Sequence, residues 1–446
     1  MTHIAAVMNS TKSFIVLTGH FIDESSAMMQ SFCLGAKQLQ PHHPAIHIKE
    51  DLKVMLDQFK VDKSKIVSAP TDGGANILAA VRILLGSSRL HIPCLAHMIN
   101  LVVQNSIDAV PEFKEICEKV KALVTYFKRS NVAMDDLRAE QAREEESEGT
   151  FLYLIQDLMT RWNPTFHALH RFITLSGYIG KILLLGKHKN APPMLTPMEV
   201  DVVRDCIAVL KPFEIATKEI SGEKYVTVSM VISIINFVRG QLQKTSPESA
   251  TAKKLKFQLE DKMNRRMADL EKVELLAVST VLDPRFKKLH FQSAINASTA
   301  IAVISREVRH QLHALDEQLS SSFIDEAPPD PKNLWSIHDK EAAKNAPESP
   351  SLTGHSLPHE LKLYLQQPFQ ARTSNPIKFW RDGKNAFPGT YRVTMKYLTV
   401  LGTSVPSERT VSRLNYVASD SRSRLTAVHT DMLVFPGSLD EKLWFA

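Results

Sequence analysis

Residues 404–435 constrain the fold most, because they read as two amphipathic segments joined by a basic turn. Ser404 is a suitable cap for the first helix. Val411 and Leu414 follow at helical spacing, and Glu408 lies one turn before Val411 on the same face. We therefore expect the Glu408 carboxylate to point toward the body of the protein, which is unusual for a charged group.

The second segment repeats apolar residues at Val428, Met432 and Phe435, as expected of a second helix. Pro436 and Gly437 follow directly and must end that helix. Any self-association through these residues is therefore predicted to be weakened by the early helix end.

The length of 446 residues exceeds one ordinary core and predicts two or three packed units. With 44% hydrophobic and 23% charged residues the chain is globular, and it contains no apolar run long enough for a membrane helix. The four cysteines lack the spacing of a disulfide framework, which predicts free thiols. The net charge of +6 permits contact with nucleic acid without demonstrating it.

The N-terminal part predicts a mixed α/β unit. The expected order is a strand at Ser13–Phe21, a strand at Met28–Ala36, a helix at Ile48–Phe59 and a strand at Lys65–Ser68. Such an order places the helix across a sheet.

Asp72 follows the last of these strands and precedes a helix that is expected near Asn76. A carboxylate at a strand end can bind a divalent metal ion when other carboxylates converge on it, since hard cations take oxygen ligands. Asp72 can equally cap the following helix. Spacing alone does not separate these two interpretations.

The motifs SVPSERTVS, SRSRL and DMLVF resemble the C-terminal dimerisation region of hAT-family DNA transposases and their domesticated relatives, including BED-finger proteins. Further landmarks occur upstream in family order: SFIVLTGHF, APTDGGANI, HIPCLAHMINL, TRWNPTF and LDPRFK. The resemblance implies an RNase H-like core interrupted by a large all-α insertion and closed by a helical dimerisation region. It also implies that Asp72 and Glu408 stand at the second and last catalytic acids of the family.

The expected domains follow from this resemblance. Residues 1–165 would form the N-terminal part of the RNase H-like core, 166–318 an all-α insertion, 319–359 a Pro-rich flexible linker, and 360–446 the C-terminal part of the core with the dimerisation region. Within the insertion, VSMVISIINFVRGQL predicts a buried helix, and LDPRFK is either a family landmark or an ordinary Pro-marked helix end. The basic segment 253–266 favours a solvated face over a DNA-binding stripe.

The chain departs from the family near Ile4. The family pattern places its first catalytic Asp there, but HIAAVMNS contains no acidic residue, and we expect the first strand of the core to be truncated. Loss of one carboxylate from a two-metal site removes a ligand that stabilises the transition state. We therefore interpret Asp72 and Glu408 as vestigial and expect no cofactor, with Mg or Mn as ligands only if the site is active.

Two further motifs have open interpretations. Cys94 and His97 lie one helical turn apart and could contribute to a metal site, but structural zinc needs four ligands, so local hydrogen bonding is favoured. By resemblance, Arg161 and Trp162 would lie beside the site, where the indole could stack on a DNA base. The alternative is a tryptophan buried in the core.

The resulting hypothesis is a transposase-derived, non-catalytic nuclear protein. It would form a homodimer and associate with DNA or with chromatin and transcription proteins, and it would not contact a membrane. The expected dimer contacts are the apolar residues of the C-terminal region, namely Val411, Leu414, Met432, Leu433 and Phe435. The alternatives are an active metal-dependent hAT transposase and a helical scaffold that binds no DNA. No paired Cys/His module of the BED type is present in the sequence.

Overall fold

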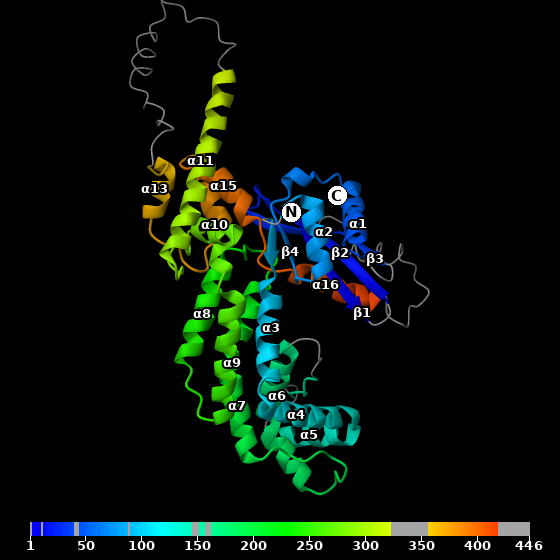
Figure 1. Cartoon of the computed structure of the whole chain (residues 1–446). Coiled ribbons are helices and arrows are strands. Elements are labelled where there is room, and N and C mark those ends of the chain that lie inside the picture. Colours follow the sequence, from blue (N-terminus) through cyan, green and yellow to red (C-terminus); the bar gives the residue numbers. More distant parts are fainter. Residues whose placement is uncertain are drawn as a thin grey trace, which may run out of the picture.

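The computed structural model describes residues 2–9, 12–39, 44–87, 90–144, 151–156, 162–322 and 356–417. An α/β part lies beside a longer helical part (Figure 1). Helices predominate and the sheets are small, so the predicted combination of α/β and all-α structure is confirmed at this level. In the described part of the chain, no helix has both the length and the apolar character that a membrane span requires.

A three-stranded antiparallel sheet forms the start of the chain. Its strands, in the order β1-β2-β3, are β1 (Thr2–Asn9), β2 (Lys12–Asp23) and β3 (Met28–Gln38). All 8 residues of β1 pair with β2, from Thr2 opposite Gly19 to Asn9 opposite Lys12. The last residues of β2, His20 to Asp23, extend past β1 and pair with β3. The truncation of the first strand relative to the family pattern stays a prediction.

A second, parallel pair of strands follows in the chain and ends next to the candidate site. The elements of this region are α1 (Ala45–Gln58), β4 (Ala69–Thr71), α2 (Ala75–Leu85) and β5 (His91–Pro93). The strand expected at residues 65–68 lies at Ala69–Thr71 instead, because Lys63–Lys65 forms a 3-10 turn in which the Asp62 side chain accepts a hydrogen bond from the Ser64 N–H. Since β4 contacts β1, the strands succeed one another as β3-β2-β1-β4-β5.

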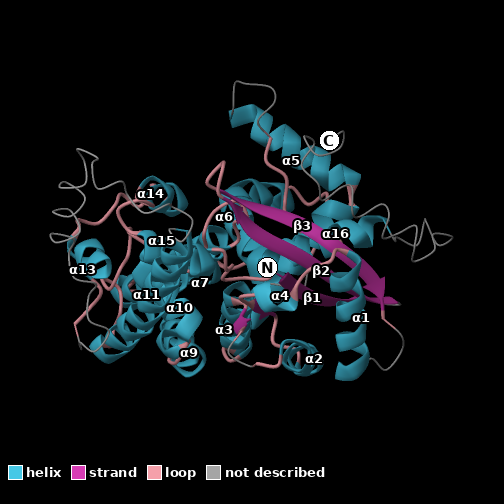
Figure 2. Cartoon of the chain, turned by 90° about the horizontal axis from the view of Figure 1, so that it is seen from above, coloured by secondary structure: helices cyan, strands magenta, loops and turns pink. Residues whose placement is uncertain are grey.

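The two faces of the first sheet are covered by different helices. Ile15 and Leu17 of β2 belong to a core cluster with apolar residues of α1 and α2. Phe14 and Val16 point to the other face, where they meet Val411 of α16 (Val405–Val417). The sheet is therefore the middle layer between α1 with α2 and α16 (Figure 2).

The helical part shares one large core. Its helices are α3 (Leu95–Asp108), α4 (Pro111–Arg129), α5 (Asn131–Glu144), α6 (Trp162–Leu184), α7 (Pro197–Ile220), α8 (Met230–Lys244), α9 (Ala250–Met267), α10 (Glu274–Leu282), α11 (Ala294–Ser322), α13 (His359–Gln366), α14 (Pro376–Asp382) and α15 (Pro388–Leu398). The predicted burial of α8 is confirmed, because six successive residues from Met230 to Ile235 are buried. Apolar residues from α3 to α15 join one cluster.

The LDPRFK motif after α10 forms a buried polar junction. Asp283 is fully buried, and Arg285 donates to it twice, from Nε to Oδ1 over 2.9 Å and from Nη2 to Oδ2 over 2.6 Å. The Ser229 hydroxyl donates to Asp283 Oδ2 over 2.6 Å. The motif therefore fixes the end of α10 against the start of α8, which an ordinary helix end would not do.

Lys287 of the same motif is also buried. Its ammonium group donates to the carbonyl oxygens of Tyr364 over 2.7 Å and Gln367 over 2.6 Å, and burial lowers its pKa. The Trp380 indole N–H donates to the Leu282 carbonyl over 2.8 Å. These contacts attach α13 and α14, which are remote in sequence, to the end of α10.

Candidate functional site

Asp72 lies directly after β4, as the sequence predicted. It is half-buried, and its Oδ1 accepts a hydrogen bond from the Gly74 N–H over 3.2 Å. This bond closes a tight turn in which Gly73 has a φ of +91°, a value that favours glycine. The N-cap of α2 is Gly74 and has no side-chain cap, so Asp72 shapes the turn and does not cap the helix itself.

Glu408 lies in the first turn of α16 and is half-buried, in agreement with its predicted inward position. Its backbone N–H donates to the Ser404 carbonyl over 3.1 Å. The Ser404 hydroxyl donates to Glu408 Oε1 over 3.4 Å, so Ser404 acts on the carboxylate as well as on the helix start. The sequence around Glu408 thus holds its side chain against the protein.

Cys94 connects the elements that carry these two acids. Its backbone N–H donates to the Thr71 carbonyl over 2.9 Å, next to Asp72. Its sulfur accepts hydrogen bonds from the backbone N–H groups of Ser404 over 3.3 Å and of His97 over 3.5 Å. The end of β4 and the start of α16 are therefore both attached to the start of α3.

The Cys94 side chain is a neutral acceptor in this arrangement. It is 1% exposed, and burial, assisted by the negative charge of Glu408, raises the pKa of its thiol. His97 is half-buried and contributes its backbone N–H to the sulfur. These contacts agree with local hydrogen bonding by the Cys-x-x-His motif, the interpretation favoured from the sequence.

The described residues contain no group of three His, Cys, Asp or Glu side chains that could hold a metal ion. Ile4 of β1, where the sequence resemblance led us to expect an acid, pairs with Leu17 of β2. Both β4, which Asp72 follows, and α16, which carries Glu408, contact β1.

A buried polar cluster beside Glu408 was not predicted. The Thr18 and Ser407 hydroxyl groups lie 2.8 Å apart, and His20 Nε2 lies 3.0 Å from the Thr18 hydroxyl. All three residues are at most 2% exposed. The sequence signal that could have predicted this cluster is the pair Thr18 and His20. They are polar residues at alternate positions of an apolar strand, so both lie on the face that α16 covers.

Trp162 is part of the core. It is 3% exposed, packs edge-to-face on Phe166 with ring centroids 5.9 Å apart, and its backbone N–H donates to Asn100 Oδ1 over 3.1 Å. The predicted stacking of this indole on a DNA base is therefore not possible in this structure, because core residues cover the ring. Arg161 lies outside the described residues.

The residues expected to form a dimer contact have different positions. Val411 is 2% exposed and packs on its own sheet, against Phe14 and Val16. Its assignment to a dimer contact is therefore wrong in this structure, because the sheet covers its side chain. Leu414 lies in α16, whereas Met432, Leu433 and Phe435 lie outside the described residues.

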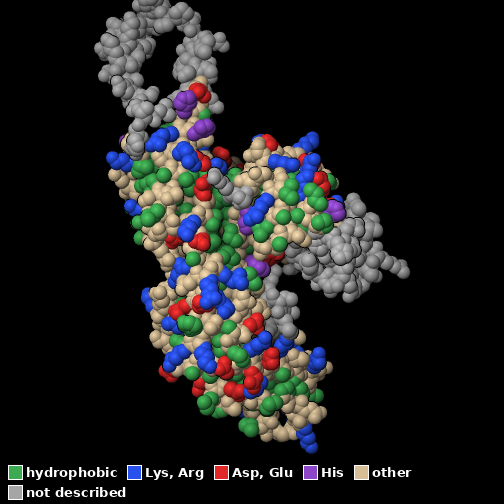
Figure 3. All heavy atoms as spheres, in the orientation of Figure 1, with side chains coloured by type: hydrophobic (Ala, Val, Ile, Leu, Met, Phe, Trp, Pro, Cys, Tyr) green, Lys and Arg blue, Asp and Glu red, His purple; other side chains and the backbone are tan. Residues whose placement is uncertain are grey.

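The basic helix α9 carries paired charges. Arg265 Nε donates to Asp261 over 3.0 Å, Lys254 forms an ion pair with Glu112, and Lys262 donates to Gln258 over 2.8 Å. On the face shown in Figure 3, acidic and basic side chains are interspersed over the helical part. This distribution agrees with the solvated face that the sequence favoured.

Comparison with known proteins places these features in a family context. Residues 92–208 match the model of the ZBED1 RNase-like helical domain, and residues 360–436 match that of the hAT family C-terminal dimerisation region. The chain is 23% identical over 443 residues to Zinc finger BED domain-containing protein 4 from Homo sapiens, covering 96% of this chain and 36% of that protein. It is 24% identical over 416 residues to a protein named Putative transcriptional regulator tpeD from Talaromyces stipitatus, covering 84% of this chain and 46% of that protein. The chain thus spans less than half the length of either relative, and its resemblance to hAT-derived proteins is confirmed.

Proposed function

We propose, from this resemblance to hAT-derived proteins, that the chain is a transposase-derived nuclear protein that self-associates and contacts DNA or transcription proteins without catalysing strand transfer. The match of residues 360–436 to the hAT dimerisation region carries the proposal of self-association. The BED-type and transcriptional names of the two relatives support a nuclear role in transcription.

An RNase H-like core is part of the proposal. The strand succession β3-β2-β1-β4-β5 supports it, together with the helices that follow β5 and the return of α16 to the sheet. In this proposal Asp72 and Glu408 correspond to two of the family's acids, and the position of Asp72 after β4 and of Glu408 in the first turn of α16 supports that correspondence. The aliphatic Ile4 on β1 supports the non-catalytic assignment, since two-metal chemistry depends on several converging carboxylates.

Self-association is tested by sedimentation of the wild type and of Leu433→Asp. We expect Leu433→Asp to lower the sedimentation coefficient at equal melting temperature, because a charge in an apolar contact between subunits must be desolvated. Val411→Asp is the matched control, since Val411 is in the core and its variant should lower the melting temperature instead. A monomeric wild type, or unchanged sedimentation of Leu433→Asp, would refute self-association through this region.

The acidic site is tested by calorimetry with Mg²⁺ and Mn²⁺. The wild type and an Asp72→Asn, Glu408→Gln double variant are expected to give equal heats, because two carboxylates are fewer ligands than such sites use. Binding by the wild type alone would favour the active transposase instead. Metal-dependent cleavage of transposon-end DNA that Asp72→Ala abolishes would then establish that alternative.

A further inference from the structure

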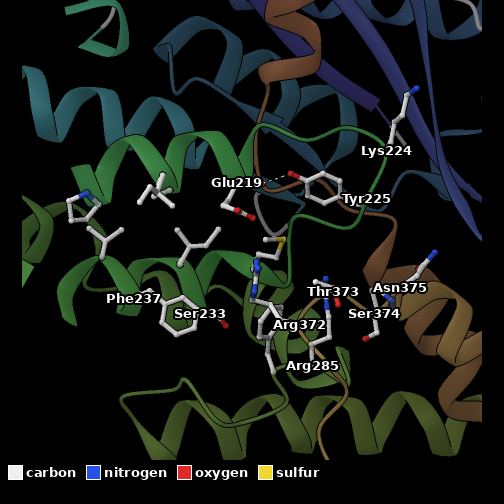
Figure 4. Close-up of a pocket in the computed structure, with 18 of the residues that line it drawn as sticks. Glu219, Lys224, Tyr225, Ser233, Phe237, Arg285, Arg372, Thr373, Ser374 and Asn375 are labelled. Carbon is white, nitrogen blue, oxygen red and sulfur yellow. Dashed lines mark hydrogen bonds between the residues drawn. The ribbon is translucent and has the colours of Figure 1, made fainter. Parts of the chain in front are cut away.

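A cavity of about 650 Å³ lies between α7, α8 and the segment 372–377, and its lining residues do not include Asp72 or Glu408 (Figure 4). This volume is in the range of small-molecule binding sites. Its walls are mainly apolar side chains of the two helices, namely Ile215, Ala216, Met230, Ile234, Phe237 and Val238. Ile215 is 49% exposed and Phe237 is 47% exposed, so large apolar surfaces on both helices face solvent at the cavity.

Ser233 gives the cavity a polar group without a partner. The residue is fully buried and lines the cavity, and within the described part of the chain its hydroxyl forms no hydrogen bond. Ser233 and Phe237 are one helical turn apart on α8 and lie on the same side of it (Figure 4). A buried hydroxyl without a partner destabilises the protein, and a polar atom of a ligand would relieve that cost.

Charged groups surround the same space. Arg285 is held by Asp283, so its charge is already compensated. Arg372 is exposed and Glu219 is half-buried, and among the described residues neither side chain forms an ion pair. In Figure 4 Glu219 and Arg372 lie on opposite sides of the cavity. Lys224 extends away from it. The Glu219 carboxylate can therefore accept a hydrogen bond from a ligand, and the Arg372 guanidinium can donate one to the same ligand.

We propose that this cavity binds a small organic ligand with an aromatic or aliphatic body. An acidic or other acceptor group of the ligand lies at Arg372, a donor lies at Glu219, and the Ser233 hydroxyl pairs with a polar atom of the body. The apolar walls contribute most of the affinity, because burial of apolar surface is the main driving force in such sites. The polar groups orient the ligand.

The test uses anilinonaphthalene sulfonate, a fluorescent probe with an aromatic body, an N–H donor and a sulfonate acceptor. We expect saturable binding to the folded chain, with one probe per chain. Ser233→Met, which narrows the cavity and removes its buried hydroxyl, and Ile215→Glu, which places a charge in its apolar wall, should each weaken binding at least tenfold. Ile215 is half-exposed, so its variant keeps the test valid if Ser233→Met does not fold.

Arg372 is tested separately with a matched neutral probe. Arg372→Gln should weaken the sulfonate probe about fivefold, since an exposed charge contributes modestly, and should leave phenylnaphthylamine binding unchanged. Arg392→Gln, an exposed arginine on α15, is the control and should change neither probe. Unchanged binding of the sulfonate probe to both Ser233→Met and Ile215→Glu would overturn the site. Equal losses of both probes in Arg372→Gln would overturn the placement of the acceptor group.

Discussion

Replacement of Cys94 by alanine tests whether this thiol attaches α16 to the end of β4. The change removes one buried heavy atom, at a cost of about 1 kcal/mol. It also leaves the N–H groups of Ser404 and His97 without their sulfur acceptor. Each unsatisfied buried donor costs about 1 kcal/mol at the lower end of the usual range, which suits weak N–H···S bonds. The total is about 3 kcal/mol. Of this, about 1 kcal/mol, the loss at the Ser404 N–H, is specific to the attachment, because the His97 N–H belongs to the start of α3 itself.

The assay is amide hydrogen exchange of the peptide that covers residues 402–411. A local loss of about 1 kcal/mol should accelerate exchange there about fivefold. Cys206→Ala is the matched control, because Cys206 is equally buried but lies in the apolar core on α7. It should accelerate exchange in α7 and leave residues 402–411 protected. Equal protection of that peptide in Cys94→Ala and Cys206→Ala would refute the bridging role.

Three further predictions concern stability. Gly402→Ala should lower stability by about 1–3 kcal/mol in thermal unfolding, because its Cβ would meet Val231 Cγ2 at 2.7 Å and the Thr227 carbonyl at 3.2 Å. Gly180→Ala, in helix α6 with open space around it, should not destabilise the chain and serves as the control. Asp283→Asn should cost about 3–5 kcal/mol in urea unfolding, since it leaves a buried guanidinium unpaired. Asp201→Asn, in an exposed ion pair, should cost less than about 1 kcal/mol, and equal effects would contradict this account. Burial raises the thiol pKa of both Cys94 and Cys206, so above a pH of about 9 the unfolded state loses protons that the folded state keeps. Stability should therefore fall with rising pH in that range, and a melting temperature that falls equally in a Cys94→Ala, Cys206→Ala variant would contradict this cause.

The sequence was sufficient to predict structural features that depend on residues close together in the chain. A β-rich composition predicted β2 and β3, and apolar residues on most sides of the segment predicted the burial of α8. The order of strand, turn and helix predicted the position of Asp72 after a strand. The half-buried position of Glu408 also followed from helical spacing alone. In each case the information lies within one element and its immediate neighbours.

The sequence-based predictions that were wrong concern which part of the molecule covers a given side chain. Helical spacing showed that Val411 belongs to an apolar face, but it could not distinguish a partner subunit from the chain's own sheet. The same holds for Trp162, whose ring could cover a base or the core. The contact between Cys94 and Ser404 joins residues 310 positions apart, and no local pattern specifies such a pair. Burial and long-range hydrogen bonds therefore required the folded structure.

The loop 221–229 joins the cavity to the start of α16. Tyr225 lines the cavity, and its hydroxyl donates to the Glu219 carbonyl over 2.7 Å. The Thr227 hydroxyl of the same loop accepts from the Gly402 N–H over 3.0 Å, and Arg409 Nη2 donates to the Ser221 carbonyl over 2.8 Å. Because Gly402 leaves no room for a side chain against this loop, a shift of the loop must also move the residues that precede Glu408. Hydrogen exchange at residues 402–411 therefore reports on the loop as well as on Cys94. To separate the two contributions, exchange of this peptide is measured at increasing concentrations of the sulfonate probe, once with the wild type and once with Cys94→Ala.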